Sequence, residues 1–210
     1  WQEIQHAEFD LEVLRGLMRE EEGEYATALE AYQRARALAE QLDNDNLRAQ
    51  SERWIAGVYG RRQQLEEAVT HAAQAIAIYE RLGDRVNLEK MRSNLAFIYV
   101  QTRQFQQALE VGIPAYSFFV EVRDPYFAAV TGANLAEAAY ELGDLHTASE
   151  YANQVLDLGD RHAAPYAHFT LGQLALAHNN PQAANEHFSQ SMQRAQHNDD
   201  PYMVAYAQRA

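Results

Sequence analysis

The sequence contains no cysteine and a single lysine, Lys90. Without cysteine the chain can form neither a disulfide framework nor a thiolate metal site, and this composition fits a reducing compartment, so we expect a cytoplasmic protein. The 17 Lys and Arg residues stand against 30 Asp and Glu residues, which gives a formal net charge of −13. Such acidity repels phosphate backbones and anionic membrane surfaces, and we therefore expect neither nucleic acid nor a membrane as a partner.

Membrane-spanning and catalytic signatures are missing as well. No stretch approaches 18 consecutive apolar residues, so no transmembrane helix is predicted. The eight histidines show no H-E-x-x-H spacing, and no Ser/His/Asp or paired-carboxylate arrangement stands out, so we predict no metal, no cofactor and no enzyme activity. The chain begins at Trp1, shows no signal-peptide pattern and is cut in mid-pattern at both ends, so we expect it to be a piece of a longer protein.

A pattern that recurs about every 40 residues dominates the sequence. In its clearest copy, residues 93–110, the pair Leu95–Ala96 precedes Tyr99, Phe105 and Ala108. Further copies cover 55–69 and 135–148, a fourth follows 36 residues later at 171–184, and a looser first copy covers 16–35. Five copies of one unit indicate a repeat protein in which each unit packs only on its neighbours.

Each unit shows the 3.6-residue apolar period twice, which predicts two helices joined by a short turn. The predicted pairs are 2–22 with 25–42, 46–62 with 65–82, 86–102 with 105–122, 126–142 with 145–158, and 163–177 with 181–196. A last helix is expected to open at 201 and is cut off at 210. We therefore predict one all-α domain over 1–210, with units 2–42, 46–82, 86–122, 126–158 and 163–197 and the start of a sixth unit at 201–210.

Glycine, aspartate and proline mark the turns between the predicted helices. Gly83 and Gly159 stand where a left-handed residue closes the last turn of a helix, and the aspartate after each can accept hydrogen bonds from the next helix. Asp124–Pro125 and Asp200–Pro201 place proline at the first helical position. We assign these residues structural roles.

A helix pair with an aliphatic–Ala/Gly dipeptide, a tyrosine three residues later and an alanine in the second helix resembles the tetratricopeptide repeat. The resemblance covers about 12–210. The units step by 40, 40, 40 and 36 residues, whereas the family's usual period is about 34. The early tryptophan of the motif is missing from its slot, and Trp54 stands beside it. Such longer units resemble those of kinesin light chain, of the spindle-orientation adaptor named for Leu-Gly-Asn repeats, and of bacterial signal-transduction ATPases and transcriptional regulators such as the maltose-regulon activator.

This resemblance implies a right-handed α-solenoid of about five helical hairpins plus a truncated sixth first helix, which binds a peptide or protein in its concave groove. In the bacterial regulators such an array is a sensor arm, and nucleotide-switch and output domains lie elsewhere in the chain. The composition, rich in Ala, Gln and Arg, favours that bacterial setting. We expect a non-catalytic module whose partners are a groove ligand and other domains of the parent protein. The alternative is a structural or oligomerisation scaffold that self-associates through its ends, without a specific groove ligand.

The first helix of each pair is expected to line the groove. Asn94 and Asn134 can each offer a donor and an acceptor to a peptide backbone, and the resemblance supports this role, because asparagine before the Leu-Gly/Ala pair commonly contacts bound peptide in the family. Aromatic side chains on the same face could anchor apolar groups, and the early part of the groove is predicted to be basic and the later part acidic. The full predicted set is Arg53, Trp54, Arg61, Lys90, Asn94, Phe97, Gln101, Asn134, Glu137, Tyr140, Glu141, Phe169 and Gln173.

These residues also have simpler interpretations. Trp54, Phe97 and Phe169 could pack against the next unit. Asn94 and Asn134 could hydrogen-bond to a neighbouring helix. The two arginines of the set could be solvated or paired with nearby glutamates.

Overall fold

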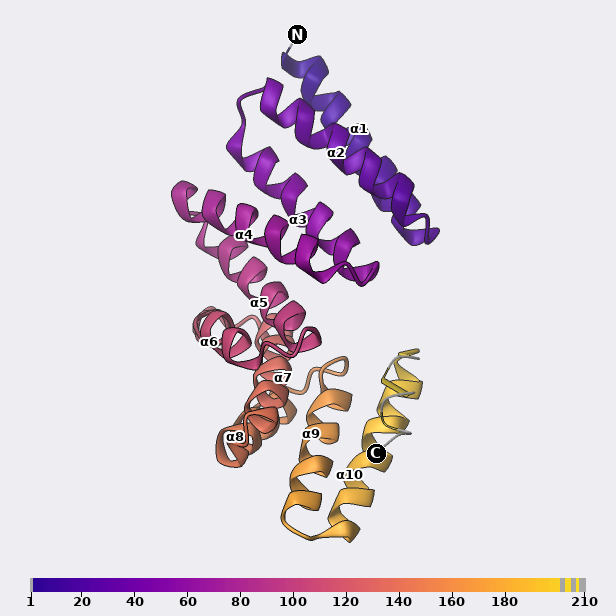
Figure 1. The fold of residues 1–210 in the computed structure, drawn as a ribbon, viewed down its shortest axis with the longest axis vertical. Helices are drawn as coiled ribbons and strands as arrows, with labels where there is room; N and C mark the ends of the chain where they lie inside the picture. The colour runs from indigo at the N-terminus through magenta and orange to yellow at the C-terminus, as the bar shows by residue number, and fades with distance from the viewer. Residues whose placement is uncertain (1, 201–202, 205–206, 208–210) are drawn as a thin grey trace. The chain divides into compact units, whose positions relative to one another are not determined.

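A computed structural model describes residues 2–200, 203, 204 and 207. Its described residues form ten α-helices and no strand, and each helix begins and ends within one residue of the prediction. The two helices of each hairpin run in opposite directions (Figure 1). The helices are α1 (Gln2–Glu21), α2 (Tyr25–Gln41), α3 (Asp45–Arg61), α4 (Leu65–Leu82), α5 (Arg85–Gln101), α6 (Phe105–Glu121), α7 (Pro125–Glu141), α8 (Leu145–Leu158), α9 (Ala164–Ala177) and α10 (Pro181–His197).

Contacts group these helices into two compact units, Trp1–Met91 and Arg92–Ala210. In the first unit, α1 packs on α2, α2 on α3 and α3 on α4. In the second, α6 packs on α7, α7 on α8, α8 on α9 and α9 on α10, and α7 also contacts α9. Within each unit, neighbouring hairpins therefore stack in chain order, as the repeat pattern predicts.

The predicted sixth unit at 201–210 lies largely outside the described residues. Of that segment, Met203, Val204 and Ala207 are helical. Met203 is fully buried beside Phe169 and Ala195. The single-domain boundaries over 1–210 stay a prediction.

The turns follow the predicted chemistry where the sequence has glycine and aspartate. Gly83 and Gly159 both have φ of +70°, in the left-handed region. The carboxylate of Asp84 accepts a hydrogen bond from the backbone N–H of Asn87 at 3.1 Å, and that of Asp124 accepts one from Phe127 at 3.1 Å. Each such cap stabilises its helix by about 1 kcal/mol.

Other turns reach the same conformation without glycine. In the two-residue turn after α5, Arg103 has φ of +58°, and the N–H of Gln104 bonds to the carbonyl of Tyr99 at 2.8 Å. The Gly83 turn closes in the same way, with the N–H of Asp84 on the carbonyl of Tyr79 at 3.0 Å. This six-to-one bond satisfies helix-end carbonyls whichever residue supplies the positive φ. Among the described residues, the non-glycine residues with a positive φ are Asp43, Gln63, Arg103, Arg123, Asn179 and Asp199.

Small residues let the paired helices approach closely. Ala56, Ala96 and Ala136, at equivalent places in successive first helices, are all buried. A methyl group added at Gly172, the fourth equivalent, would lie 2.5 Å from the ring of Phe188. Large side chains fill the space beside these contacts, and the largest of the fully buried ones are Tyr32, Tyr79 and Phe119.

Candidate binding surface

The predicted binding residues lie on odd-numbered helices in both units. In the first unit they lie on α3 and at the start of α5, and in the second on the rest of α5, on α7 and on α9. The surface formed in the second unit by these three helices is called the α5–α7–α9 face below.

In the first unit, Trp54 is the aromatic residue among the predicted binding residues, and its ring packs against other helices. Trp54 stacks on Tyr32 of α2, with ring centroids 5.7 Å apart, and lies 6.4 Å from Phe9 of α1. It packs against the buried side chains of both helices. Its ring therefore stabilises the stacking of α3 on the first hairpin.

The arginines of the first unit also have partners within it. The guanidinium of Arg53 lies 5.2 Å from the centroid of the Trp54 ring, a cation–π contact. Arg61 forms an ion pair with Glu20 of α1, whose carboxylate also accepts a hydrogen bond from the Tyr32 hydroxyl at 2.8 Å. Lys90, at the start of α5, is half-buried and engaged in an interaction of its own.

In the second unit, two polar contacts hold α5 beside α7. The hydroxyls of Ser93 and Thr131 are 2.6 Å apart in a buried position. Ten residues further on, in the turn after α5, the guanidinium of Arg103 donates to the carboxylate of Glu141 at the end of α7, at 3.1 Å. Between these contacts α5 exposes Asn94, and Phe97 remains 46% exposed. Asn94 and Phe97 therefore lie on a helix that runs along α7.

Asn134 and Glu137, one turn apart on α7, carry polar groups that no described residue pairs. Asn134 is 8% exposed, and its Nδ2 has no hydrogen-bond partner among the described residues. The described residues likewise offer the half-buried carboxylate of Glu137 no hydrogen bond or ion pair. The pKa of Glu137 is raised to about 7: burial is the main cause, the charge of Glu141 contributes in the same direction, and the charge of Arg103 opposes both. An unpaired buried donor costs about 1–3 kcal/mol, so this pair of residues weakens the fold.

On the remaining part of the face, packing engages most of the predicted residues. Phe169 of α9 is 7% exposed and lies 5.4 Å from Phe188 of α10. The ring of Tyr140 packs against a core cluster that includes Leu174. Gln101 and Gln173 are half-buried. The side chains of this face that remain accessible to a ligand are therefore concentrated along α5 and α7.

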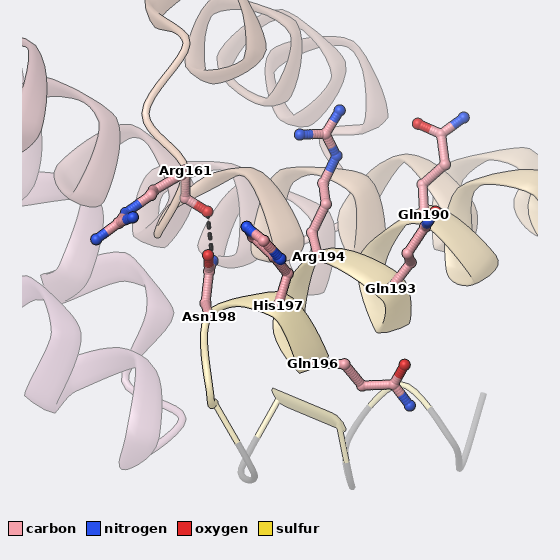
Figure 2. Close-up of a pocket in the computed structure, with 7 residues that line it drawn as sticks. All are labelled: Arg161, Gln190, Gln193, Arg194, Gln196, His197 and Asn198. Atoms are coloured by element: carbon pink, nitrogen blue, oxygen red, sulfur yellow. Dashed lines mark hydrogen bonds between the residues drawn. The ribbon is translucent and has the colours of Figure 1, made fainter.

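Sequence reasoning missed two features of α9 and α10. The first is a histidine pair: the Nδ1 atoms of buried His168 and half-buried His187 are 3.3 Å apart, and His168 is 5% exposed. The second is an open hollow of about 780 Å³ beside the end of α10, where Asn198 donates to the carbonyl of Arg161 at 2.6 Å (Figure 2). Its lining is polar and partly basic, and consists of Arg161, Gln190, Gln193, Arg194, Gln196, His197 and Asn198. The spacing of residues along a single helix could not indicate either feature, because each feature brings together residues from different helices or turns.

Comparison with known proteins decides the family. A model described as tetratricopeptide repeat matches residues 9–81 and 47–119, which together span more than half of the chain. The chain belongs to the tetratricopeptide-repeat family. This confirms the predicted fold class, an all-α solenoid of tetratricopeptide hairpins. The match is to a repeat and indicates no catalytic family.

Solved structures of tetratricopeptide proteins are similar to the chain along most of its length. A signal-transduction ATPase with numerous domains and a tetratricopeptide-repeat sensor, from Pyrococcus horikoshii, is 11% identical with a TM-score of 0.83 over 97% of this chain and 33% of that one. The Rap conjugation gene regulator of plasmid pLS20, in complex with the Phr* peptide, is 15% identical with a TM-score of 0.72 over 95% and 56%. A kinesin light chain of Podosopora anserina with nearly identical repeats is 18% identical with a TM-score of 0.73 over 94% and 97%.

At these identities the likeness establishes the fold of the tetratricopeptide chain and not its ligand. The chain spans about a third of the archaeal ATPase and just over half of the Rap regulator. No curated protein sequence matches it. Within the part of the chain that the structure describes, no helix is both long enough and apolar enough to cross a membrane.

Proposed function

We propose that this tetratricopeptide chain is a non-catalytic module that binds an extended peptide segment on the α5–α7–α9 face, as the partner-binding or sensor arm of a larger regulator. The observation that carries the proposal is the amide of Asn134, which is buried on this face with its donor unpaired. Folding alone gains nothing from such a group, whereas a peptide carbonyl would satisfy it.

Two neighbouring features support the same interpretation. Asn94, exposed on α5, offers a second amide with both donor and acceptor capacity. Phe97, 46% exposed one turn later, offers an apolar contact of the type that dominates interface energetics. A peptide lying along α5 and α7 could thus bond through its backbone and bury one side chain against Phe97.

The first unit is a weaker candidate for the ligand. Its Trp54 is packed between helices, and Arg53 and Arg61 already contact Trp54 and Glu20. A groove ligand would have to displace these contacts. We therefore place the peptide on the second unit. That Lys90, Gln101 and Gln173 contact the ligand stays a prediction. The cytoplasmic location of the protein also stays a prediction.

The relatives fit this proposal. The Rap regulator was solved with a peptide bound, and the archaeal ATPase carries its tetratricopeptide repeats as a sensor. A chain of the same fold that spans only part of each is suited to be one arm of a longer protein. We propose that further domains accompany it in that protein, and the flanking sequence would test this.

Replacing Asn94 and Asn134 together by alanine is expected to weaken peptide binding at least tenfold, because each amide loses its bonds to the peptide backbone. Heptapeptides selected on the wild-type chain from a random library serve as probes, with affinities measured by fluorescence anisotropy. The matched control changes Gln106 and Gln107, exposed on α6, to alanine and should leave affinity unchanged. Helicity and melting temperature are expected to stay at wild-type values in both variants. Equal affinity of the double variant would place the site elsewhere, and loss of helicity would assign the asparagines to the fold.

The alternative, a scaffold that self-associates through its ends, is favoured by one observation on α1. Leu11, Leu14 and Met18 lie on one stripe of this helix with exposures of 47%, 57% and 61%, and Ile4, also on it, is 59% exposed. Apolar residues at this spacing are typical of a helix face that packs against another helix. If the scaffold function holds, light scattering over a dilution series will show a mass that rises with concentration, and Leu14→Glu will abolish the rise. A mass that stays monomeric at every concentration would contradict self-association.

A further inference from the structure

The charge around Glu137 is unbalanced. Glu141 adds a second carboxylate one turn later on α7, and the cation that acts on Glu137 is Arg103. That guanidinium is already 3.1 Å from Glu141 and is held at the rim of the face. Two carboxylates therefore share one arginine, and the more buried of them has no partner.

The neighbouring helices do not supply the missing charge. α6 and α8, which both pack on α7, contain no Lys or Arg; α6 carries Glu110 and Glu121, and α8 carries Glu150, Asp157 and His146, which faces Glu150. α9 contains no Asp, Glu, Lys or Arg, and its one histidine, His168, faces His187 of α10. The part of α5 in the second unit carries one charged residue, Arg92, which has an interaction of its own. Arg92 precedes Ser93, and Ser93 bonds to Thr131 of α7. Thr131 lies six residues before Glu137, so the backbone position of Arg92 is nearly two helical turns away from Glu137. The site is thus preformed to accept a cation that the unit itself does not provide.

We propose that Glu137 receives a cationic side chain of the bound peptide, an arginine guanidinium or a lysine ammonium, while Asn134 donates to a backbone carbonyl of the same peptide. The two residues are three apart on α7 and project from one side of the helix. A charge-assisted hydrogen bond to a partly desolvated carboxylate is roughly twice as strong as a neutral one. This inference rests on the proposed peptide-binding function and specifies the side chain that the face selects.

A structural role for Glu137 explains these features less well. A carboxylate that stabilises a fold has hydrogen bonds or an ion pair, and its pKa falls. Glu137 has neither partner among the described residues, and its pKa is raised to about 7. Since folding raises this pKa above its ordinary value of 4.5, Glu137 lowers stability increasingly as pH rises from 4.5 to 7. An unfavourable titratable group kept at a half-buried surface position is typical of a functional residue.

The same geometry makes binding depend on pH. The cation attracts only the ionised carboxylate, which with a pKa of about 7 is roughly ten times more populated at pH 8 than at pH 6. Affinity for a cationic peptide is therefore expected to fall about tenfold between pH 8 and pH 6. Binding at pH 6 to 7 is accompanied by release of a proton, because the bound cation lowers the pKa of Glu137.

The test uses two pools of N-acetylated, C-amidated heptapeptides that differ only at the central position, which is arginine in one pool and citrulline in the other. Citrulline keeps the shape of arginine and removes its charge. We expect the wild-type chain to bind the arginine pool at least tenfold more tightly at pH 8, with the preference reduced about tenfold at pH 6. Glu137→Gln is expected to bind both pools equally at both pH values. The control Glu110→Gln, exposed on α6, should keep the wild-type preference.

The melting temperature of Glu137→Gln at pH 8 is measured in parallel and should equal or exceed that of the wild type, which shows that the variant is folded. Equal binding of the two pools by the wild type, or a preference that survives in Glu137→Gln, would overturn the assignment of Glu137 and leave peptide binding intact. No binding of either pool by the wild type would overturn both this inference and the proposed function.

Discussion

Replacing Phe119 by alanine is expected to lower the free energy of unfolding by about 3–5 kcal/mol. The ring is 1% exposed near the end of α6. It stacks on Phe127 of α7 with centroids 4.9 Å apart and meets Phe118 edge-on at 5.4 Å. Alanine would remove the apolar surface of the ring and leave a cavity at the junction of two hairpins, where neither helix can move in without losing its other contacts.

The adjacent Val120 is the matched control for this substitution. It lies one position further along α6 but is 48% exposed, so Val120→Ala is expected to change stability by less than about 0.5 kcal/mol. Urea denaturation of both variants, followed by circular dichroism, measures the difference. A loss below about 1 kcal/mol in Phe119→Ala would contradict the tight packing of α6 on α7.

Acidification from pH 7 to pH 4 is expected to remove about 3 kcal/mol of stability through His168 alone. The pKa of this imidazole is lowered from its ordinary 6.5 to about 4, mainly by burial and in smaller part by the charges of Arg194 and the neighbouring His187. Its Nε2 is buried, and no described residue bonds to it, so a proton added there meets no acceptor among them.

The sign follows from the two pKa values of His168. Above pH 6.5 the imidazole is neutral in both states, and His168 does not affect the pH dependence. Between pH 6.5 and 4 only the unfolded chain binds the proton, so stability falls with pH, and below pH 4 the loss is complete. In His168→Gln, the decrease in unfolding free energy from pH 7 to pH 4 should be about 3 kcal/mol smaller than in the wild type. His146→Gln, with a side chain 84% exposed, should retain the wild-type decrease. A decrease of the same size in all three proteins would refute the assignment.

Periodicity predicted the helices well because helix formation depends on neighbours three and four residues away. The turns show where this local information ends. Gly83 marks its turn in the sequence, whereas Arg103 occupies an equivalent left-handed position without any such mark. The closing bond from the Gln104 N–H to the Tyr99 carbonyl belongs to the backbone, so packing of the two helices can impose the turn on any residue that tolerates the small conformational cost.

The candidate site was predictable only as a face of helices. Asn94 and Asn134 hold equivalent positions in successive units, yet the first is exposed and the second is 8% exposed. Phe97 and Phe169 were both predicted as anchors, and the structure exposes the first and buries the second against α10. Residue type is the same in each comparison, and the two asparagines also share their repeat position, so the difference in exposure arises from the helices that pack next to each side chain.

By itself, the sequence determined that the chain is a series of tetratricopeptide hairpins, where their helices begin and end, and which side of each helix is apolar. These properties follow from hydrogen bonds and side-chain contacts within a few residues. Only the tertiary structure decided that Trp54 and Phe169 are packed, that Asn134 keeps an unpaired donor and that Glu137 has no hydrogen bond or ion pair among the described residues. Those properties depend on contacts between residues nearly 40 positions apart, such as Ser93 with Thr131, and on the water that these contacts exclude.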